Sequence, residues 1–135
     1  MKQMEESTKI KILRYNFEEI IFILIIIAYD LTKYTKDELS DFNEAIEGRI
    51  EVLFKKEFLL ILREHYVISN DLVYKLESLK NDIVNLYESN WMKKLLENDQ
   101  QIHFLKSKAS EILLELKIEE NDAKKYSEDN LVINW

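Results

Sequence analysis

The sequence predicts an all-α protein: an antiparallel up-down bundle of four or five long helices, followed by a loose C-terminal tail. The 135 residues include one Gly and no Pro, so the chain lacks the residues that tight turns and hairpins need. Apolar residues recur every three or four positions, which is the spacing of one helix face. Helix-capping residues separate these apolar series. Because the expected connections are short, helices adjacent in sequence should run antiparallel.

The first helix is expected from about Ser7 to the residues before Thr35. A heptad-like apolar series runs along it: Ile10, Leu13, Phe17, Ile20, Leu24, Ile27, Leu31 and Tyr34. Across residues 20–27 the other faces are apolar too, which is typical of a buried helix. A buried strand is the alternative, but the sequence offers no comparable strand to pair with it. Since the apolar surface exceeds what one bundle seam needs, a homodimer through Ile23 and Ile26 is also expected.

The second helix is expected to begin after Thr35. Thr35 and Glu38 have the spacing of a capping box. The helix should continue to about Tyr66, with a periodic series of Leu39, Phe42, Ile46, Ile50, Leu53, Glu57 and Leu60. Gly48 interrupts it and costs about 1 kcal/mol relative to Ala in a helix interior. A kink, or the close approach of a neighbouring helix, would explain this glycine.

Two further helices are expected. Ser69, Asn70 and Asp71 are capping residues, and they precede the series Leu72, Leu76, Leu79, Ile83 and Leu86. Ser89 and Asn90 should end this third helix. The fourth carries Leu95, Ile102, Leu105, Ala109, Ile112 and Leu116, and the polar segment 98–101 is a candidate interruption.

The C-terminal residues differ in composition from the rest of the chain. Residues 119–130 are polar and are expected to be loose, whereas residues 131–135 are mostly apolar and suit a short docked segment. We therefore expect a helical bundle domain over residues 1–118 and a polar tail over residues 119–135.

Composition and charge favour a cytoplasmic protein that binds neither membranes nor nucleic acid. The apolar run of residues 20–29 would span about 15 Å as a helix, against about 30 Å for a hydrocarbon core. Glu18 and Glu19 directly precede that run, unlike the basic residues of a signal peptide. A net charge of -7 disfavours nucleic acid and anionic lipid, since both attract Lys and Arg.

The sequence predicts no catalytic residue, no metal ion and no cofactor. Cysteine is absent, which excludes disulfides and thiolate chemistry. One glycine cannot form a P-loop, a dinucleotide-binding turn or a G-x-S-x-G elbow. The two histidines, His65 and His103, lack the Glu three residues earlier that a ferritin-like di-iron site requires.

One short segment resembles an enzyme family. Asn98 to His103 is similar to the motif of the HEPN ribonucleases, in which an Arg and a short spacer precede a His. Asn98 stands where that family has its catalytic Arg. The resemblance implies RNA cleavage at His103, and it covers six residues only.

The most informative feature is a set of carboxylates that should share one face of the second helix: Asp37, Asp41, Glu44, Glu47 and Glu51. At a rise of 1.5 Å per residue they form a stripe about 20 Å long. One interpretation is a solvated face whose first acids favour the helix dipole. That interpretation explains Glu44, Glu47 and Glu51 less well, because like charges three or four residues apart oppose helix formation. The other interpretation is a docking surface for a basic protein.

The leading functional hypothesis is a bacterial protein-interaction module of the immunity or antitoxin type. Such a protein would be a stoichiometric inhibitor that binds a basic toxin, such as a nuclease, through the acidic helix face. A structural or scaffolding bundle that homodimerises is the alternative. A degenerate HEPN-like ribonuclease is a third hypothesis.

Overall fold

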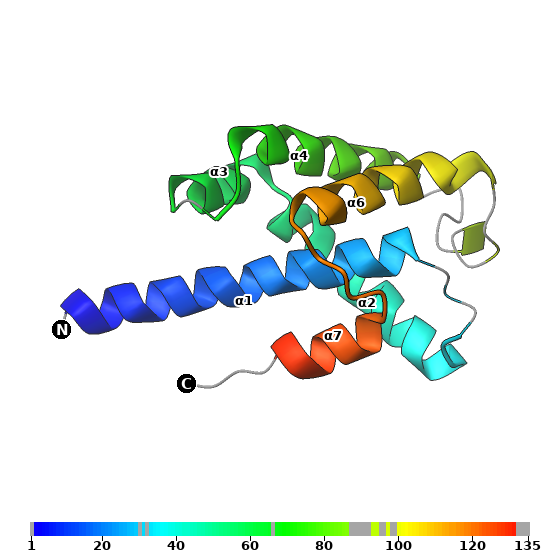
Figure 1. Cartoon of the computed structure of the whole chain (residues 1–135), viewed down its shortest axis with the longest axis horizontal. Coiled ribbons are helices and arrows are strands. Elements are labelled where there is room, and N and C mark those ends of the chain that lie inside the picture. The colour runs from blue at the N-terminus through cyan, green and yellow to red at the C-terminus, as the bar shows by residue number, and fades with distance from the viewer. Residues whose placement is uncertain are drawn as a thin grey trace.

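The computed structural model describes residues 2–29, 31, 33–65, 67–86, 93–94, 97 and 100–131. Within these residues the chain forms helices joined by turns and contains no strand (Figure 1). The predicted all-α class is confirmed, although the described helices depart from a plain four-helix arrangement in two places.

Helix α1 (Lys2–Ala28) is the central element of the fold. It contacts α2 (Lys36–Leu53), α6 (His103–Glu115) and α7 (Ala123–Asn130), and Figure 1 shows it running along the length of the molecule. Every side chain from Ile20 to Ile27 is buried. This confirms the prediction that the helix is buried on all faces in this segment. Because Ile23 and Ile26 are covered within a single chain, they leave no apolar surface for a second copy.

Helix α2 begins at the predicted capping box. The Glu38 backbone N–H donates to Thr35 Oγ1 at 3.2 Å, and the Thr35 backbone N–H donates to Glu38 Oε1 at 2.9 Å. These two bonds satisfy donors that the first helical turn leaves without partners. The predicted second helix therefore starts where the sequence indicates.

The prediction that this helix continues to about Tyr66 is wrong. Helix α2 ends at Leu53, and a separate helix α3 (Lys56–Glu64) follows. Phe54 is fully buried at the turn, and α3 packs against α4 (Asn70–Asn85). Because the helix breaks here, the apolar face of α3 can pack on α4. A straight continuation of α2 would instead have run along α1.

Helices α4 and α6 lie side by side (Figure 1). Ser69 caps α4 as predicted, because its Oγ accepts the Leu72 backbone N–H at 3.2 Å. Residues Gln100–Ile102 form a 3-10 turn, so the α-helix that follows begins at His103. The expected break at residues 89–90 and the helix start near residue 95 lie outside the described residues.

Helix α6 ends in a Schellman motif built without glycine. The Ile118 N–H donates to the Leu113 carbonyl at 2.9 Å, and the Lys117 N–H donates to the Leu114 carbonyl at 3.0 Å. Lys117 adopts φ 61°, a left-handed conformation that this motif usually gives to glycine. The motif reverses the chain, which then returns towards α1.

The expectation of a loose segment at residues 119–130 is wrong. Residues 123–130 form α7, which packs on α1, and Ala123 and Tyr126 are buried there. Asp122 Oδ1 caps the helix by accepting the backbone N–H groups of Lys124 and Lys125, and the Tyr126 hydroxyl donates to the Glu18 carboxylate. The predicted docking of residues 131–135 falls, apart from half-buried Leu131, outside the described residues.

Candidate functional site

The five predicted carboxylates lie together on the solvent side of α2. Asp37, Asp41, Glu44, Glu47 and Glu51 are all exposed, whereas the buried residues of the helix are Phe42, Ile46, Ile50 and Leu53. We call this set the acidic stripe. Its place follows from the helix period, because the apolar face turns towards α1 and leaves the carboxylates in solvent.

No cation of the described chain pairs with the acidic stripe. Within the described ranges, none of its five carboxylates forms an ion pair. Arg49, on the same helix, turns away to Glu19 on α1, with Nε and Oε2 3.1 Å apart. Glu38 also lies outside the stripe: the Thr35 N–H and the Lys124 ammonium, 3.1 Å away, lower the pKa of Glu38. The negative charge of the stripe is therefore uncompensated within the described part of the fold.

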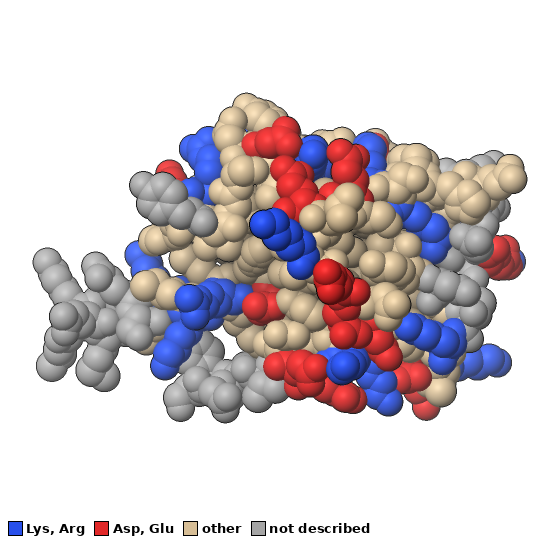
Figure 2. All heavy atoms as spheres, viewed as in Figure 1, with Lys and Arg blue, Asp and Glu red and all other residues tan. Residues whose placement is uncertain are grey.

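Elsewhere on the surface acidic and basic groups are mixed. Figure 2 shows both kinds side by side on the face that carries α6 and α7. Between α4 and α6, Lys75 Nζ lies within 3.3 Å of three carboxylates, those of Asp71, Glu111 and Glu115. Lys108 likewise pairs with Asp82. The acidic stripe differs from this face, because none of its carboxylates pairs with a cation of the described chain.

Gly48 lies within the acidic stripe, between Glu44 and Glu51. The expectation that the close approach of a neighbouring helix explains this glycine is wrong, whereas the expected kink stays a prediction. Helix α2 continues through it, and a Cβ added at Gly48 would meet nothing within 4 Å. Val52, beside the stripe, is 55% exposed. Nothing in the described fold requires glycine here, and its backbone is open to an approaching molecule.

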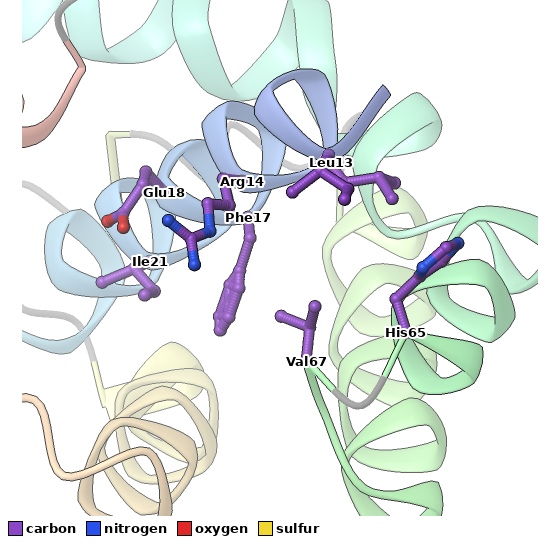
Figure 3. Close-up of a pocket in the computed structure, with 8 residues that line it drawn as sticks. Leu13, Arg14, Phe17, Glu18, Ile21, His65 and Val67 are labelled. Carbon is purple, nitrogen blue, oxygen red and sulfur yellow. The ribbon is translucent and has the colours of Figure 1, made fainter. Parts of the chain in front are cut away.

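A groove beside α1 is a second surface feature. It has a volume of about 550 Å³ and lies between α1 and the connection from α3 to α4. Leu13, Phe17, Ile21 and Val67 make it apolar, while Arg14, Glu18 and His65 add polar groups. In Figure 3 Phe17 and Val67 point into the space between the two segments, and the guanidinium of Arg14 lies beside Phe17. This groove could not be predicted from the sequence, because residues far apart in the chain form it.

The described residues contain no cluster suited to a metal ion. No group of three or more His, Asp or Glu side chains within them is placed to hold a metal ion. His65 borders the groove, and His103 is exposed at the start of α6. Asn98, the other end of the ribonuclease-like segment, lies outside the described residues. Among the described helices, none combines the length and apolar character needed to cross a membrane.

The sequence matches no protein-family model, and comparisons with characterised proteins and with solved structures give no match. The surfaces of the chain itself are therefore the basis for inferring its function.

Proposed function

We propose that this chain is a protein-interaction module whose acidic stripe binds a basic partner protein. We further propose that it acts as a stoichiometric inhibitor of the immunity or antitoxin type, with a basic toxin such as a nuclease as its target. One observation carries the proposal: five exposed carboxylates share one helix face and have no ion-pair partner among the described residues. Arg and Lys side chains of a partner would supply the missing charges.

The fold holds the acidic stripe in a fixed arrangement. The capping box anchors α2 at its first turn, the Arg49–Glu19 ion pair ties its middle to α1, and Leu53 and Phe54 are buried at its end. Packing thus offsets the mutual repulsion of the acids, which would oppose an isolated helix. A partner would meet carboxylates that need little further ordering, which lowers the entropic cost of binding.

The spacing of the stripe suits a target that normally binds a polyanion. Carboxylates three or four residues apart on a helix are separated by a rise of about 4.5–6 Å. Phosphates along one strand of duplex DNA follow one another at about 3.4 Å of axial rise. These separations are of the same order, so a cationic nucleic-acid cleft offers charges at suitable intervals. Such a cleft is the kind of surface that a nuclease would present to the stripe.

The proposal is tested by comparing three versions of the full chain as baits, with the product of the adjacent gene as the first candidate partner. The versions are the wild type, Glu44→Lys with Glu51→Lys, and Glu57→Lys with Glu64→Lys as control. The control pair is exposed on α3 and has the same seven-residue spacing and the same change in charge. We expect wild type and control to bind a basic protein equally and to inhibit its activity at one-to-one stoichiometry.

The stripe variant should bind this partner at least about 100-fold more weakly, because charge pairs at an interface are replaced by repulsion. The association rate of the wild type should fall steeply with salt. A partner that binds the stripe variant as tightly as the wild type would contradict the proposed mechanism.

That the chain is not an enzyme also remains a prediction. The purified full chain, incubated with single-stranded RNA, should show no cleavage above that of a His103→Ala variant. Cleavage that disappears in His103→Ala would favour the ribonuclease hypothesis instead.

A further inference from the structure

The apolar series of α1 extends beyond the core of the described fold. Ile20 and Leu24 are buried, Leu13 and Phe17 are partly buried, and Ile10 is 48% exposed. These residues follow one another by three and four, the spacing that packs one helix along another. In Figure 1 the N-terminal part of α1 extends past the other helices. This part of the seam therefore has the pattern of a helix-packing surface and becomes more exposed towards Ile10.

The groove of about 550 Å³ lies along this same part of α1. Leu13 and Phe17 line it from α1, and Val67 lines it from the opposite side (Figure 3). An apolar groove beside an exposed apolar ridge suits helix packing, in which the ridge of one helix fills the groove beside another. Each chain has both the apolar ridge of α1 and the groove beside it. In a dimer, the ridge of each copy can therefore fill the groove of the other.

The groove carries one basic and one acidic group, which could pair with the same two groups of a second copy. Arg14 and Glu18 both line it, and Arg14 forms no ion pair within the described residues. Glu18 accepts a hydrogen bond from the Tyr126 hydroxyl, and no cation of the described chain pairs with it. An acid that follows a base by four residues is the weaker orientation for a pair within one helix. The Arg14 guanidinium, and the Glu18 oxygen that does not accept from Tyr126, thus remain available to a partner.

We infer that a second copy of this chain docks in this groove, with residues 10–21 of the two α1 helices antiparallel about a twofold axis. An axis midway between positions 14 and 18 places Arg14 opposite Glu18 of the partner subunit, and the same pair forms again by symmetry. A wholly acidic or wholly basic helix would leave one of the two charges unpaired in the groove. The balanced charges therefore favour a second copy as the occupant.

This dimer is independent of the acidic stripe, which lies on α2. It also does not use Ile23 and Ile26, which are buried within each chain. The new surface consists of Ile10, Leu13, Arg14, Phe17 and Glu18. An interface of this kind leaves both acidic stripes free for a basic partner.

The test measures the mass of the full chain by sedimentation velocity, from about 5 to about 300 μM, because dimerisation depends on concentration. We expect the wild type to move from one chain towards two chains over this range. Ile10→Asp should raise the dimer dissociation constant about 100-fold, because each dimer loses the same apolar contact twice. Ile12→Asp is the matched control, since Ile12 is 45% exposed but does not line the groove.

A second pair of variants tests the charges. Arg14→Glu should raise the dissociation constant about tenfold or more, because it places two carboxylates opposite each other. Lys11→Glu makes the same change of charge at an exposed residue that does not line the groove, and it should have little effect. Thermal unfolding of each variant at low concentration establishes that the monomer is folded.

A wild type that remains a single chain over the whole concentration range would overturn the inference. Equal weakening by Ile10→Asp and Ile12→Asp, or by Arg14→Glu and Lys11→Glu, would overturn it as well. The stripe variant Glu44→Lys with Glu51→Lys should dimerise like the wild type, so failure of the proposed function and failure of this inference are distinguishable.

Discussion

The hydroxyl of Tyr34 accepts the backbone N–H of Ala123 at 2.9 Å and so joins the segment after α1 to the first residue of α7. The first N–H groups of a helix have no acceptor within the helix, and Tyr34 satisfies one of them. The same hydroxyl donates to Asp122 Oδ1 at 3.4 Å, and the Tyr34 ring packs edge-on against Phe42, with ring centroids 4.9 Å apart. One side chain thus connects the segment after α1 with α2 and α7.

Tyr34→Phe should lower the free energy of unfolding by about 1–2 kcal/mol, because it leaves the N–H of a fully buried residue without its acceptor. The ring packing against Phe42 is retained. Urea unfolding followed by circular dichroism measures the loss, and amide exchange should speed up most in residues 123–130. Tyr74→Phe is the control, because Tyr74 is 61% exposed and should change stability by less than about 0.5 kcal/mol. Equal losses in the two variants would contradict this role for Tyr34.

Tyr34 should also make stability depend on alkaline pH. Burial raises the pKa of Tyr34 to about 12 from its ordinary value of 10.0; the Ala123 N–H opposes this shift, and the Asp122 carboxylate adds to it. The folded state therefore favours the neutral hydroxyl. Its contribution is fully present below pH 10, and it is lost as the pH rises towards and through 12.

We therefore expect the urea midpoint of the wild type to fall between pH 10 and 12 more steeply than that of Tyr34→Phe. Burial and Glu18 also raise the pKa of Tyr126, so both proteins lose some stability in this range. The difference between the two curves isolates Tyr34. Parallel curves would show that its ionisation is not linked to folding.

Features encoded by local sequence were predictable. The capping side chains of Thr35 and Ser69 act on residues three positions away, so their spacing in the sequence identifies them. The run of residues 20–27 is apolar on every face and is buried throughout. The acidic stripe was predictable for the same reason, since the helix period alone places its members on one face.

Features that depend on distant residues were missed. The break between α2 and α3 has no capping side chain, because Lys55 makes no such hydrogen bond, and α3 is placed by its packing on α4. Helix α7 is held by Glu18 and Tyr34, about 90 to 110 positions earlier in the chain. Asp122 was a readable cap, but a short polar helix without an apolar stripe looks like a loop. The groove and the unpaired state of the stripe likewise depend on tertiary packing.

Lys117→Gly should stabilise the protein by about 0.5–1 kcal/mol. A left-handed conformation costs a residue with a side chain about 1–2 kcal/mol, and the greater flexibility of unfolded glycine offsets part of this gain. Urea unfolding measures the change. Lys125→Gly, within α7, serves as the opposite case and should lower stability by about 1 kcal/mol. A loss of stability in Lys117→Gly would mean that its side chain contributes more than its backbone conformation costs.

Gly48→Ala should have opposite effects on stability and on partner binding. Alanine is favoured over glycine by about 1 kcal/mol in a helix interior, and its Cβ would meet nothing within 4 Å, so urea unfolding should show a gain of that size. If a partner approaches the backbone between the stripe carboxylates, the added methyl group should weaken its affinity several-fold. Ser40→Ala, exposed on the same helix, should leave affinity unchanged. A Gly48→Ala protein that is more stable but binds the partner equally well would show that the partner does not approach the backbone at Gly48. The contact would then lie elsewhere along the stripe.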